Sequence, residues 1–190
     1  MTKLIEIETP RLRLRQWQVK DKPLFAKINL DPDVMAYYPR TLDSGESNIL
    51  ADMFKTLIAE KGWGFWAVER KEDASFIGFV GLHEPAYDLP VTPCVEIGWR
   101  LSTKAWGKGY ATEAAQAVMH VAFVEIKLSE VFSFASVTNK KSIAVMERIG
   151  MSNTQCNFEH PIIPEQHPLR EHVLYKINKK QWQEQNSQQN

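Results

Sequence analysis

The chain has 190 residues, of which 44% are hydrophobic and 24% are charged. This length and composition predict one globular domain with a substantial core over residues 1–178, followed by a polar tail at 179–190 that we expect to be frayed. Lys plus Arg and Asp plus Glu both number 23, so the net charge is zero. No basic field therefore points to nucleic acid or to a membrane surface as a partner.

Targeting and redox signals are weak throughout the sequence. The apolar runs are far shorter than the ~18 residues that suggest a membrane span, and the first residues carry charges without the apolar region of a signal peptide. The two cysteines, Cys94 and Cys156, have no metal-binding or redox spacing. We therefore expect a reduced, cytoplasmic setting.

The first third of the chain predicts a strand and two helices. Leu12 and Leu14 alternate with arginines, which predicts a strand over about residues 5–16. The stretch "DKPLFAKINL" predicts a short helix with Pro23 in its first turn. Apolar residues at helical spacing in "SGESNILADMFKTLIAE" predict a longer helix, which ends before Gly62.

The middle of the chain predicts three strands. "FWAVER" and "FIGFVGLH" are separated by "KEDAS" and predict a hairpin. A proline-rich loop, "PAYDLPVTP", leads to a third strand at 94–101. Trp63, Phe65 and Trp66 lie in or next to the first of these strands and are expected in the core.

Strands and helices alternate in the last part of the chain. We expect a helix at about 112–126, the strand "EVFSFAS", a helix that begins at Asn139 and ends at Gly150, a strand in "MSNTQCNF" and a final strand "EHVLYKI". The order of elements predicts an α/β (α+β mixed) fold. Its centre would be a mixed, mostly antiparallel sheet of about seven strands, flanked by about four helices.

The stretch "KAWGKGYATEA" joins a predicted strand to the start of a predicted helix. Gly107 and Gly109 uncover backbone N–H groups and permit unusual φ angles, and the helix dipole adds positive potential, so we expect a phosphate site. A P-loop would need glycine at Ser102, and a dinucleotide-binding loop would need a third glycine at Thr112. A plain turn with a helix cap is the alternative.

The segments "EIGWRLSTKAWGKGYATEA" and "VTNKKSIAVMERIGM" together resemble the GNAT acyl-CoA-dependent N-acetyltransferases. In that superfamily the loop reads Gln/Arg-x-x-Gly-x-Gly/Ala, and here Lys104 replaces the first residue. The opening "ETPRLRLRQW" and the ending "HVLYKI" resemble the branch that includes the ribosomal-protein N-terminal acetyltransferases. The resemblance covers nearly the whole chain and leaves the acceptor unidentified.

The resemblance implies that acetyl-CoA is the co-substrate and that loop amides hold its pyrophosphate. This role carries over to Trp106, Gly107, Lys108, Gly109, Tyr110 and Ala111. It also implies that the backbone of the preceding strand pairs with the pantetheine arm, here at Ile97, Gly98, Trp99, Arg100 and Leu101. Asn139 resembles the asparagine that hydrogen-bonds pantetheine, and an ordinary helix N-cap is the alternative reading.

Acyl transfer to an amine benefits from a base, because an amine is mostly protonated at neutral pH. Glu96 is the first candidate, since it lies in an otherwise apolar strand two residues before Gly98 and on the same face. A salt bridge to Arg100 or Arg13 is the alternative explanation. His83, at the end of a strand, is a weaker candidate.

The leaving thiolate needs a proton or a hydrogen bond. Many members of the superfamily use a tyrosine, but the corresponding position here is Met146. Ser142 resembles the serine that the ribosomal branch places near the sulfur, and a plain surface serine is the alternative. Because the usual acid is absent, a non-catalytic acyl-CoA-binding sensor is the alternative to an enzyme.

We expect direct transfer to a primary amine, either a protein N-terminus or a small molecule, by a monomer or homodimer. Neither cysteine suggests a covalent relay. Trp17, Tyr37 and Tyr38 are candidates to line the acceptor pocket, and "FEHPIIPEQHPLREH" is expected to form a loop over it. Cys156, His160, His167 and His172 match no standard zinc spacing, so we expect no metal.

Overall fold

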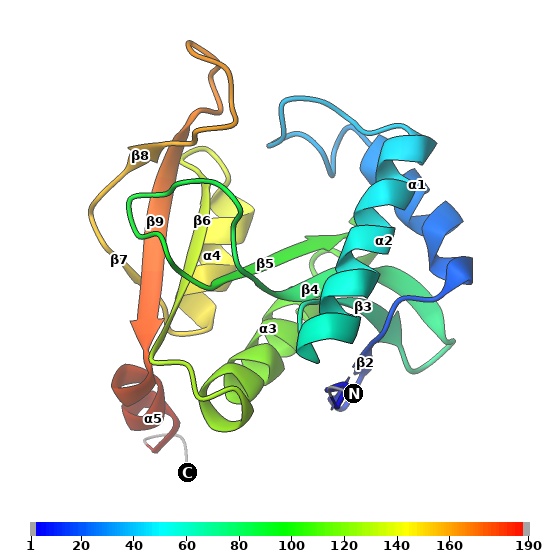
Figure 1. Ribbon diagram of the computed structural model, residues 1–190, viewed down its shortest axis with the longest axis horizontal. Coiled ribbons are helices and arrows are strands. Elements are labelled where there is room, and N and C mark those ends of the chain that lie inside the picture. Colours follow the sequence, from blue (N-terminus) through cyan, green and yellow to red (C-terminus); the bar gives the residue numbers. More distant parts are fainter. Residues whose placement is uncertain (1–2, 188–190) are drawn as a thin grey trace. The chain divides into compact units, whose positions relative to one another are not determined.

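The structure, a computed structural model, describes residues 3–187 (Figure 1). The chain divides into two compact units. The first comprises Met1–Leu82 and Gly98–Val118, and the second comprises His83–Ile97 and Met119–Asn190. Strand β5 (Glu96–Leu101) contributes two residues to the second unit and four to the first.

The first unit carries helices beside antiparallel strands, in which β1 pairs with β2, β2 with β3 and β3 with β4 (Figure 1). Its elements are β1 (Ile7–Glu8), β2 (Leu12–Arg15), the 3₁₀-helix η1 (Val19–Asp21), α1 (Lys22–Leu30), α2 (Ser44–Lys61), β3 (Phe65–Arg70), β4 (Ser75–His83) without its last residue, the end of β5, the 3₁₀-helix η2 (Thr103–Ala105) and most of α3 (Tyr110–His120).

Local sequence signals set the limits of α2 as expected. The Asp43 side chain accepts a hydrogen bond from the Glu46 backbone N–H, and the Glu46 carboxylate accepts one from Asp43 N–H. This reciprocal capping box satisfies two backbone donors at the helix start. Gly62, with φ of 82°, ends the helix in the left-handed conformation that glycine tolerates best.

The single strand expected over residues 5–16 is wrong, because this segment folds back on itself. β1 and β2 pair antiparallel, with Ile7 opposite Leu14. Thr9 makes the turn between them, since its Oγ1 accepts from Leu12 N–H at 2.9 Å and its own N–H donates to Leu12 O at 2.9 Å. Pro10, which has no backbone N–H to donate, follows at the bend.

Aromatic rings fill the core of the first unit. Trp17 is 3% exposed and lies against Phe25, Phe54 and Phe76, with centroid distances of 5.0–5.8 Å. Its indole N–H donates to Phe65 O at 2.7 Å, so the polar atom of the ring is satisfied. Trp17 is therefore a core residue, and its suggested role in lining an acceptor pocket is wrong.

The second unit holds the strands around β9. β5 pairs with β6 in parallel, whereas β6, β7 and β8 each pair with β9 antiparallel. Besides the start of β5 and the end of α3, its elements are the π-helix η3 (Val121–Glu125), β6 (Glu130–Ser136), α4 (Lys140–Arg148), β7 (Ser152–Asn153), β8 (Phe158–Glu159), β9 (Glu171–Asn178) and α5 (Lys179–Ser187).

The described residues thus form nine strands and five α-helices, and the strands pair mostly antiparallel, which confirms the fold class. The count exceeds the expected seven strands because residues 5–16 and residues 151–159 each hold two short strands where one was expected. Lys179–Ser187, expected as part of a frayed tail, forms α5, while residues 188–190 lie outside the described residues. The ring of Trp182 packs 5.3 Å from that of Phe123, which gives α5 an apolar anchor. Within residues 3–187, no helix is both long and apolar enough to cross a bilayer.

Candidate active site

The glycine loop of the first unit has the geometry of an anion site. Gly107 and Gly109 have φ angles of 72° and 78°, and residues 107–109 are exposed. Helix α3 begins at Tyr110, so the backbone donors of its first turn lie at the end of the loop. A Cβ added at Gly107 would meet no atom within 4 Å, so the positive φ rather than crowding explains the glycine.

A clamp that the sequence reasoning missed holds this loop. Arg11 donates from Nη1 to Lys108 O at 2.9 Å and from Nε to a Glu113 carboxylate oxygen at 2.6 Å. Glu113 also accepts from the Thr9 hydroxyl at 2.6 Å and from Arg11 N–H at 3.0 Å. The only signal in the sequence was the opening "ETPRLRLRQW", which contributed to the resemblance without a role for Arg11.

Glu113 is charged in this clamp. Burial alone would raise the pKa of its carboxyl, but hydrogen bonds from Thr9 and Arg11 lower that pKa below its ordinary value. The Arg11 guanidinium also lies over the Tyr110 ring, 4.6 Å from its centroid. The loop is thereby tied on both sides to the turn between β1 and β2.

The part of β5 in the first unit approaches its neighbours closely. A Cβ at Gly98 would lie 3.2 Å from Cε1 of Phe65, so packing under this ring accounts for the glycine. The Trp106 indole N–H donates to Leu101 O at 2.9 Å, which anchors the loop to the end of the strand. These contacts place Gly98–Leu101 and the loop residues 106–111 within one unit.

Glu96 lies in the second unit, where its side chain is 13% exposed. One carboxylate oxygen is 3.0 Å from Nδ1 of His83, which follows the apolar part of β4. Burial raises the pKa of Glu96, and the His83 hydrogen bond partly opposes this rise. A buried carboxylate with a raised pKa and an imidazole partner is the arrangement expected of a general base.

The sequence left open that Glu96 has a structural role, in a salt bridge to Arg100 or Arg13. Arg13 instead pairs with Glu8 at 2.6 Å, and its Nη1 lies 3.8 Å from Glu69. Arg100 donates to Asn29. Glu96 instead contacts His83, the weaker of the two candidates for the base.

Asn139 and Ser142 meet at the start of α4 in the second unit. The Asn139 side-chain oxygen accepts from Ser142 N–H at 3.1 Å, so the N-cap expected for Asn139 is present. In the same unit, β5 and β6 are held side by side. Glu96 lies opposite Phe132 in their parallel pairing, and the Ile97 carbonyl accepts a hydrogen bond from the Ser133 hydroxyl at 2.9 Å.

Two side chains of the second unit are unsuited to proton or acyl transfer. Met146 is 1% exposed and belongs to the core. Burial, with a smaller contribution from Glu96, raises the pKa of the Cys94 thiol to about 11, so its thiolate is scarce at neutral pH. Cys94 packs against the hydrophobic cluster of Leu89, Phe132, Phe158 and Leu174.

The late histidines form a ring cluster. His160 and His172 are each 6% exposed, and their ring centroids are 4.8 Å apart. Nδ1 of His160 is buried with no hydrogen-bond partner among the described residues, whereas Nδ1 of His172 lies 3.0 Å from Arg170 O. Between residues 3 and 187, no three His, Cys, Asp or Glu side chains are grouped to hold a metal ion.

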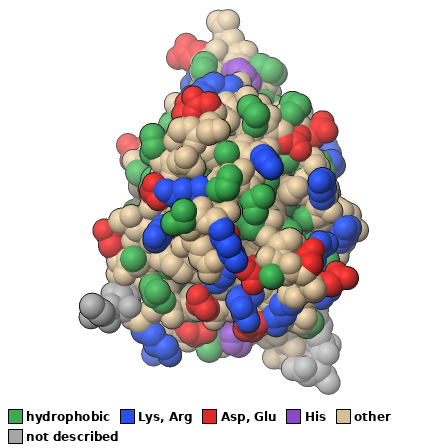
Figure 2. Space-filling view, turned by 90° about the vertical axis from the view of Figure 1, so that its right-hand side faces the viewer, with side chains coloured by type: hydrophobic (Ala, Val, Ile, Leu, Met, Phe, Trp, Pro, Cys, Tyr) green, Lys and Arg blue, Asp and Glu red, His purple; other side chains and the backbone are tan. Residues whose placement is uncertain are grey.

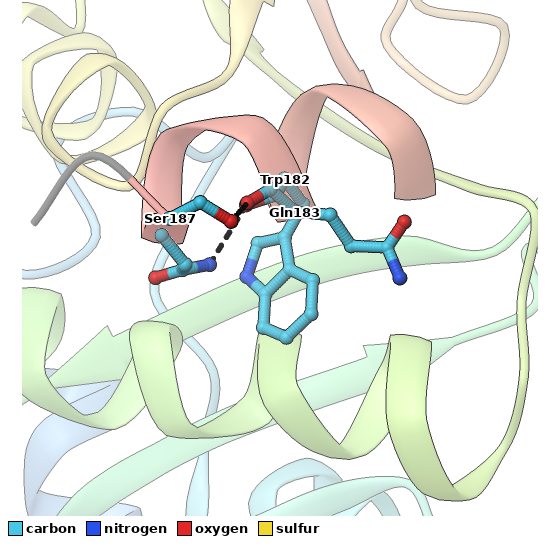
Figure 3. A pocket seen from close by; sticks show the side chains of 4 residues that line it. Trp182, Gln183 and Ser187 are labelled. Atoms are coloured by element: carbon cyan, nitrogen blue, oxygen red, sulfur yellow. Dashed lines mark hydrogen bonds between the residues drawn. The ribbon is translucent and has the colours of Figure 1, made fainter. Parts of the chain in front are cut away.

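The pocket on α5 holds no predicted site residue. A shallow pocket of about 370 Å³ is lined by Trp182, Gln183, Asn186 and Ser187, all from α5 (Figure 3). On the face drawn in Figure 2, acidic and basic side chains are interspersed, in keeping with the zero net charge.

Residues 11–152 match the family described as "Acetyltransferase (GNAT) domain". This match spans the glycine loop, β5, and the Asn139 cap. The chain therefore belongs to the GNAT acetyltransferase family and is an N-acetyltransferase.

Relatives extend over most of the chain. It is 34% identical to "Uncharacterized protein YkkB" of Bacillus subtilis over 85% of this chain and 92% of that one. It is similar to the structure of "the acetyltransferase (GNAT family) from Bacillus anthracis", with 26% identity and a TM-score of 0.77 over 93% and 99% of the two chains. It shares the fold of "Ribosomal-protein-S5-alanine Acetyltransferase from Vibrio fischeri", with 15% identity and a TM-score of 0.73 over 94% and 98%.

Proposed function

We propose that this N-acetyltransferase moves an acetyl group from acetyl-CoA directly to a primary amine, with Glu96 as the general base. The observation that carries the proposal is the buried Glu96 carboxylate, 3.0 Å from His83 and with a raised pKa. A carboxylate with a raised pKa accepts a proton more readily than an ordinary carboxylate does.

The glycine loop supports acetyl-CoA as the donor. Its exposed amides, its two left-handed glycines and the start of an 11-residue helix suit a pyrophosphate. We assign this role to residues 106–111 and assign pantetheine pairing to the backbone of 97–101, with Asn139 as a further donor. Bound there, acetyl-CoA would supply an activated acetyl thioester.

Glu96 and Ser142 would handle protons at opposite ends of the reaction. Glu96 would accept a proton from the attacking amine, directly or through water, and a backbone N–H near Gly98 or Trp99 would stabilise the oxyanion. Ser142 would hydrogen-bond the departing sulfur. The raised pKa of Cys94 argues against an acetylated cysteine and supports direct transfer.

An acceptor screen tests the proposal. Thiol release from acetyl-CoA is measured with peptides bearing N-terminal Ala or Ser, with polyamines, with amino acids and with aminoglycosides. Thiol release with at least one class, lost in Glu96→Gln and kept in the exposed control Glu130→Gln, is expected. Acetyl-CoA binding without thiol release for any amine would instead identify the acyl-CoA-binding sensor. Cys94→Ala with Cys156→Ala should keep most turnover, and a trapped acetyl-enzyme would contradict direct transfer.

A further inference from the structure

Arg100 carries a buried positive charge that forms no ion pair within the described part of the chain. The residue is 9% exposed and belongs to the part of β5 that lies in the first unit. Its Nη1 donates to the side-chain oxygen of Asn29 at 2.7 Å, and the Asn29 amide nitrogen donates to the Ser47 hydroxyl at 2.8 Å. Asn29 and Ser47 are completely buried, so the neutral oxygen that faces Arg100 has a fixed orientation.

The same unit shows how a structural buried arginine is satisfied. Arg15 is 4% exposed and forms a two-pronged pair with Asp21 at 2.7 and 2.9 Å, and its Nε donates to Glu69 at 2.9 Å. Among residues 3–187, no carboxylate lies at ion-pair distance from Arg100. An unpaired buried charge is unfavourable, which makes Arg100 different from an arginine retained for packing.

The unpaired part of Arg100 is one edge of its guanidinium. Nε is enclosed and has no hydrogen-bond partner within the described part of the chain. Since Asn29 takes Nη1, the remaining edge is formed by Nε and Nη2, whose N–H groups point in the same direction. This is the edge that binds both oxygens of a carboxylate in a bidentate pair.

Aromatic rings hold the guanidinium plane. The Tyr38 ring centroid lies 4.2 Å from Cζ of Arg100, and that of Phe79 lies 5.6 Å away. Tyr38 is 38% exposed and belongs to the turn-rich segment between α1 and α2 (Figure 1). These contacts orient the guanidinium through its face and use none of its N–H donors, and Tyr38 is the ring of the two that reaches solvent.

These contacts set Arg100 apart from the glycine loop. Its partners come from α1, from the segment after α1 and from β4, whereas the loop is clamped by Thr9 and Arg11. An anion at Arg100 is therefore a different group from the phosphates assigned to the loop.

We propose that Arg100, oriented by Asn29 and Tyr38, binds a carboxylate carried by the acceptor, so that the acceptor is an amino acid or a related amino carboxylate. This inference rests on the proposed function, and it narrows that function from amines in general to amines that bear a carboxylate. Tyr38, suggested from the sequence as a pocket residue, has its role here in covering the guanidinium.

The test compares matched acceptors. Amino acids with one to four carbons between the amine and carboxylate are each paired with their carboxamides, and kcat/KM is measured for both. The wild-type protein should prefer one carboxylate to its amide by about tenfold or more, since a charged partner strengthens a hydrogen bond. Equal rates for every pair would overturn the inference while leaving amine acetylation intact.

Variants separate binding from structure. Asn29→Asp would place a carboxylate at 2.7 Å from Nη1, and the Ser47 hydroxyl, which accepts from the Asn29 amide in the wild-type protein, would donate to this carboxylate instead. The fold should therefore hold while the charge of Arg100 is neutralised. A binding role predicts that Asn29→Asp and Arg100→Gln raise KM about tenfold or more for the carboxylate and little for the amide. If Arg100 has only a structural role, Asn29→Asp should change KM equally for the carboxylate and for the amide. That result would overturn the inference. Arg40→Gln, an exposed arginine of the same segment paired with Glu46, is the control and should leave the preference unchanged.

A second readout does not require turnover. The N-acetylated amino carboxylate of the preferred chain length should raise the melting temperature of the wild-type protein and not that of Asn29→Asp. If no amine is acetylated, the proposed function fails, and this measurement alone decides whether Arg100 binds carboxylates. No rise in melting temperature for any chain length, together with no carboxylate preference, overturns the inference.

Discussion

Arg11 and Glu113 are 102 residues apart in sequence, and their side chains form a hydrogen-bonded ion pair at 2.6 Å. The pair joins the turn before β2 to the first turn of α3. Because Arg11 also donates to Lys108 O, this contact sets the position of the glycine loop. The chemistry assigned to the loop thus depends on a residue from the other end of the first unit's sequence.

We predict that Arg11→Met weakens acetyl-CoA binding, because the loop loses the donor to Lys108 and the partner of Glu113. Arg11 is half exposed, so the free energy of unfolding should change by less than about 1 kcal/mol while the Kd for acetyl-CoA rises several-fold. Calorimetric titration and thermal melting measure the two effects. Arg13→Met is the matched control, with a similar exposure and an ion pair to Glu8. An equal change in Kd for both variants would contradict the clamp.

Gly109→Val is expected to weaken acetyl-CoA binding more strongly than it destabilises the fold. A β-branched residue at φ of 78° is strained by about 1–2 kcal/mol or more, and its side chain would cover the backbone donors. Gly62→Ala introduces left-handed strain at a φ of 82° outside the loop and is the control. The assignment fails if a folded Gly107→Val, Gly109→Val double variant keeps wild-type affinity.

Glu96→Gln should lower kcat by about 10²–10⁴-fold and remove the acidic limb of the pH–rate profile, while acetyl-CoA affinity holds. Since burial raises the pKa of Glu96, the wild-type limb should lie above the pH at which an ordinary carboxylate titrates. His83→Leu removes the hydrogen bond that lowers this pKa, so the limb should move to higher pH with kcat preserved on the alkaline side. A limb unmoved by either variant would assign the titration to another group.

Ser142→Ala is expected to reduce kcat by about tenfold, as expected for one hydrogen bond to a charged group. The backbone N–H of residue 142 still donates to Asn139, so the cap of α4 and the melting temperature should be unaffected. Ser152→Ala, at an exposed position of β7, is the control. The variant can be assayed with acetyl-CoA and with an acetyl thioester that has a better leaving thiol. If Ser142→Ala is fully active with both donors, the serine has only a surface role.

The His160 and His172 cluster should make the fold sensitive to acid. Burial, and then the neighbouring His172, lowers the pKa of His160 from 6.5 to about 4. The unfolded chain therefore binds the proton first, so this contribution to stability is complete above pH 6.5 and is lost as the pH falls toward 4. His160→Leu should flatten the fall in melting temperature across this range and remove an unpaired buried nitrogen. An unchanged slope would show that other groups dominate.

Local patterns predicted most of the helices and strands. The capping box at Asp43, the left-handed glycine at Gly62 and the N-cap at Asn139 involve neighbours within a few residues, so the chain itself specifies them. The same holds for the glycine loop, whose φ angles only glycine adopts readily. From these signals came the fold class and the resemblance that the family comparison confirmed.

Tertiary structure decided which polar groups meet. The division of residues 5–16 into two strands depends on a turn stabilised by Thr9, and the burial of Trp17 depends on rings that three other elements contribute. The partners of Arg11 and Arg100 likewise come from distant segments. Residue spacing encodes periodicity and caps, which are local. The pairing of distant side chains follows instead from strand register and helix packing, because these alone determine which groups lose water together and must satisfy one another.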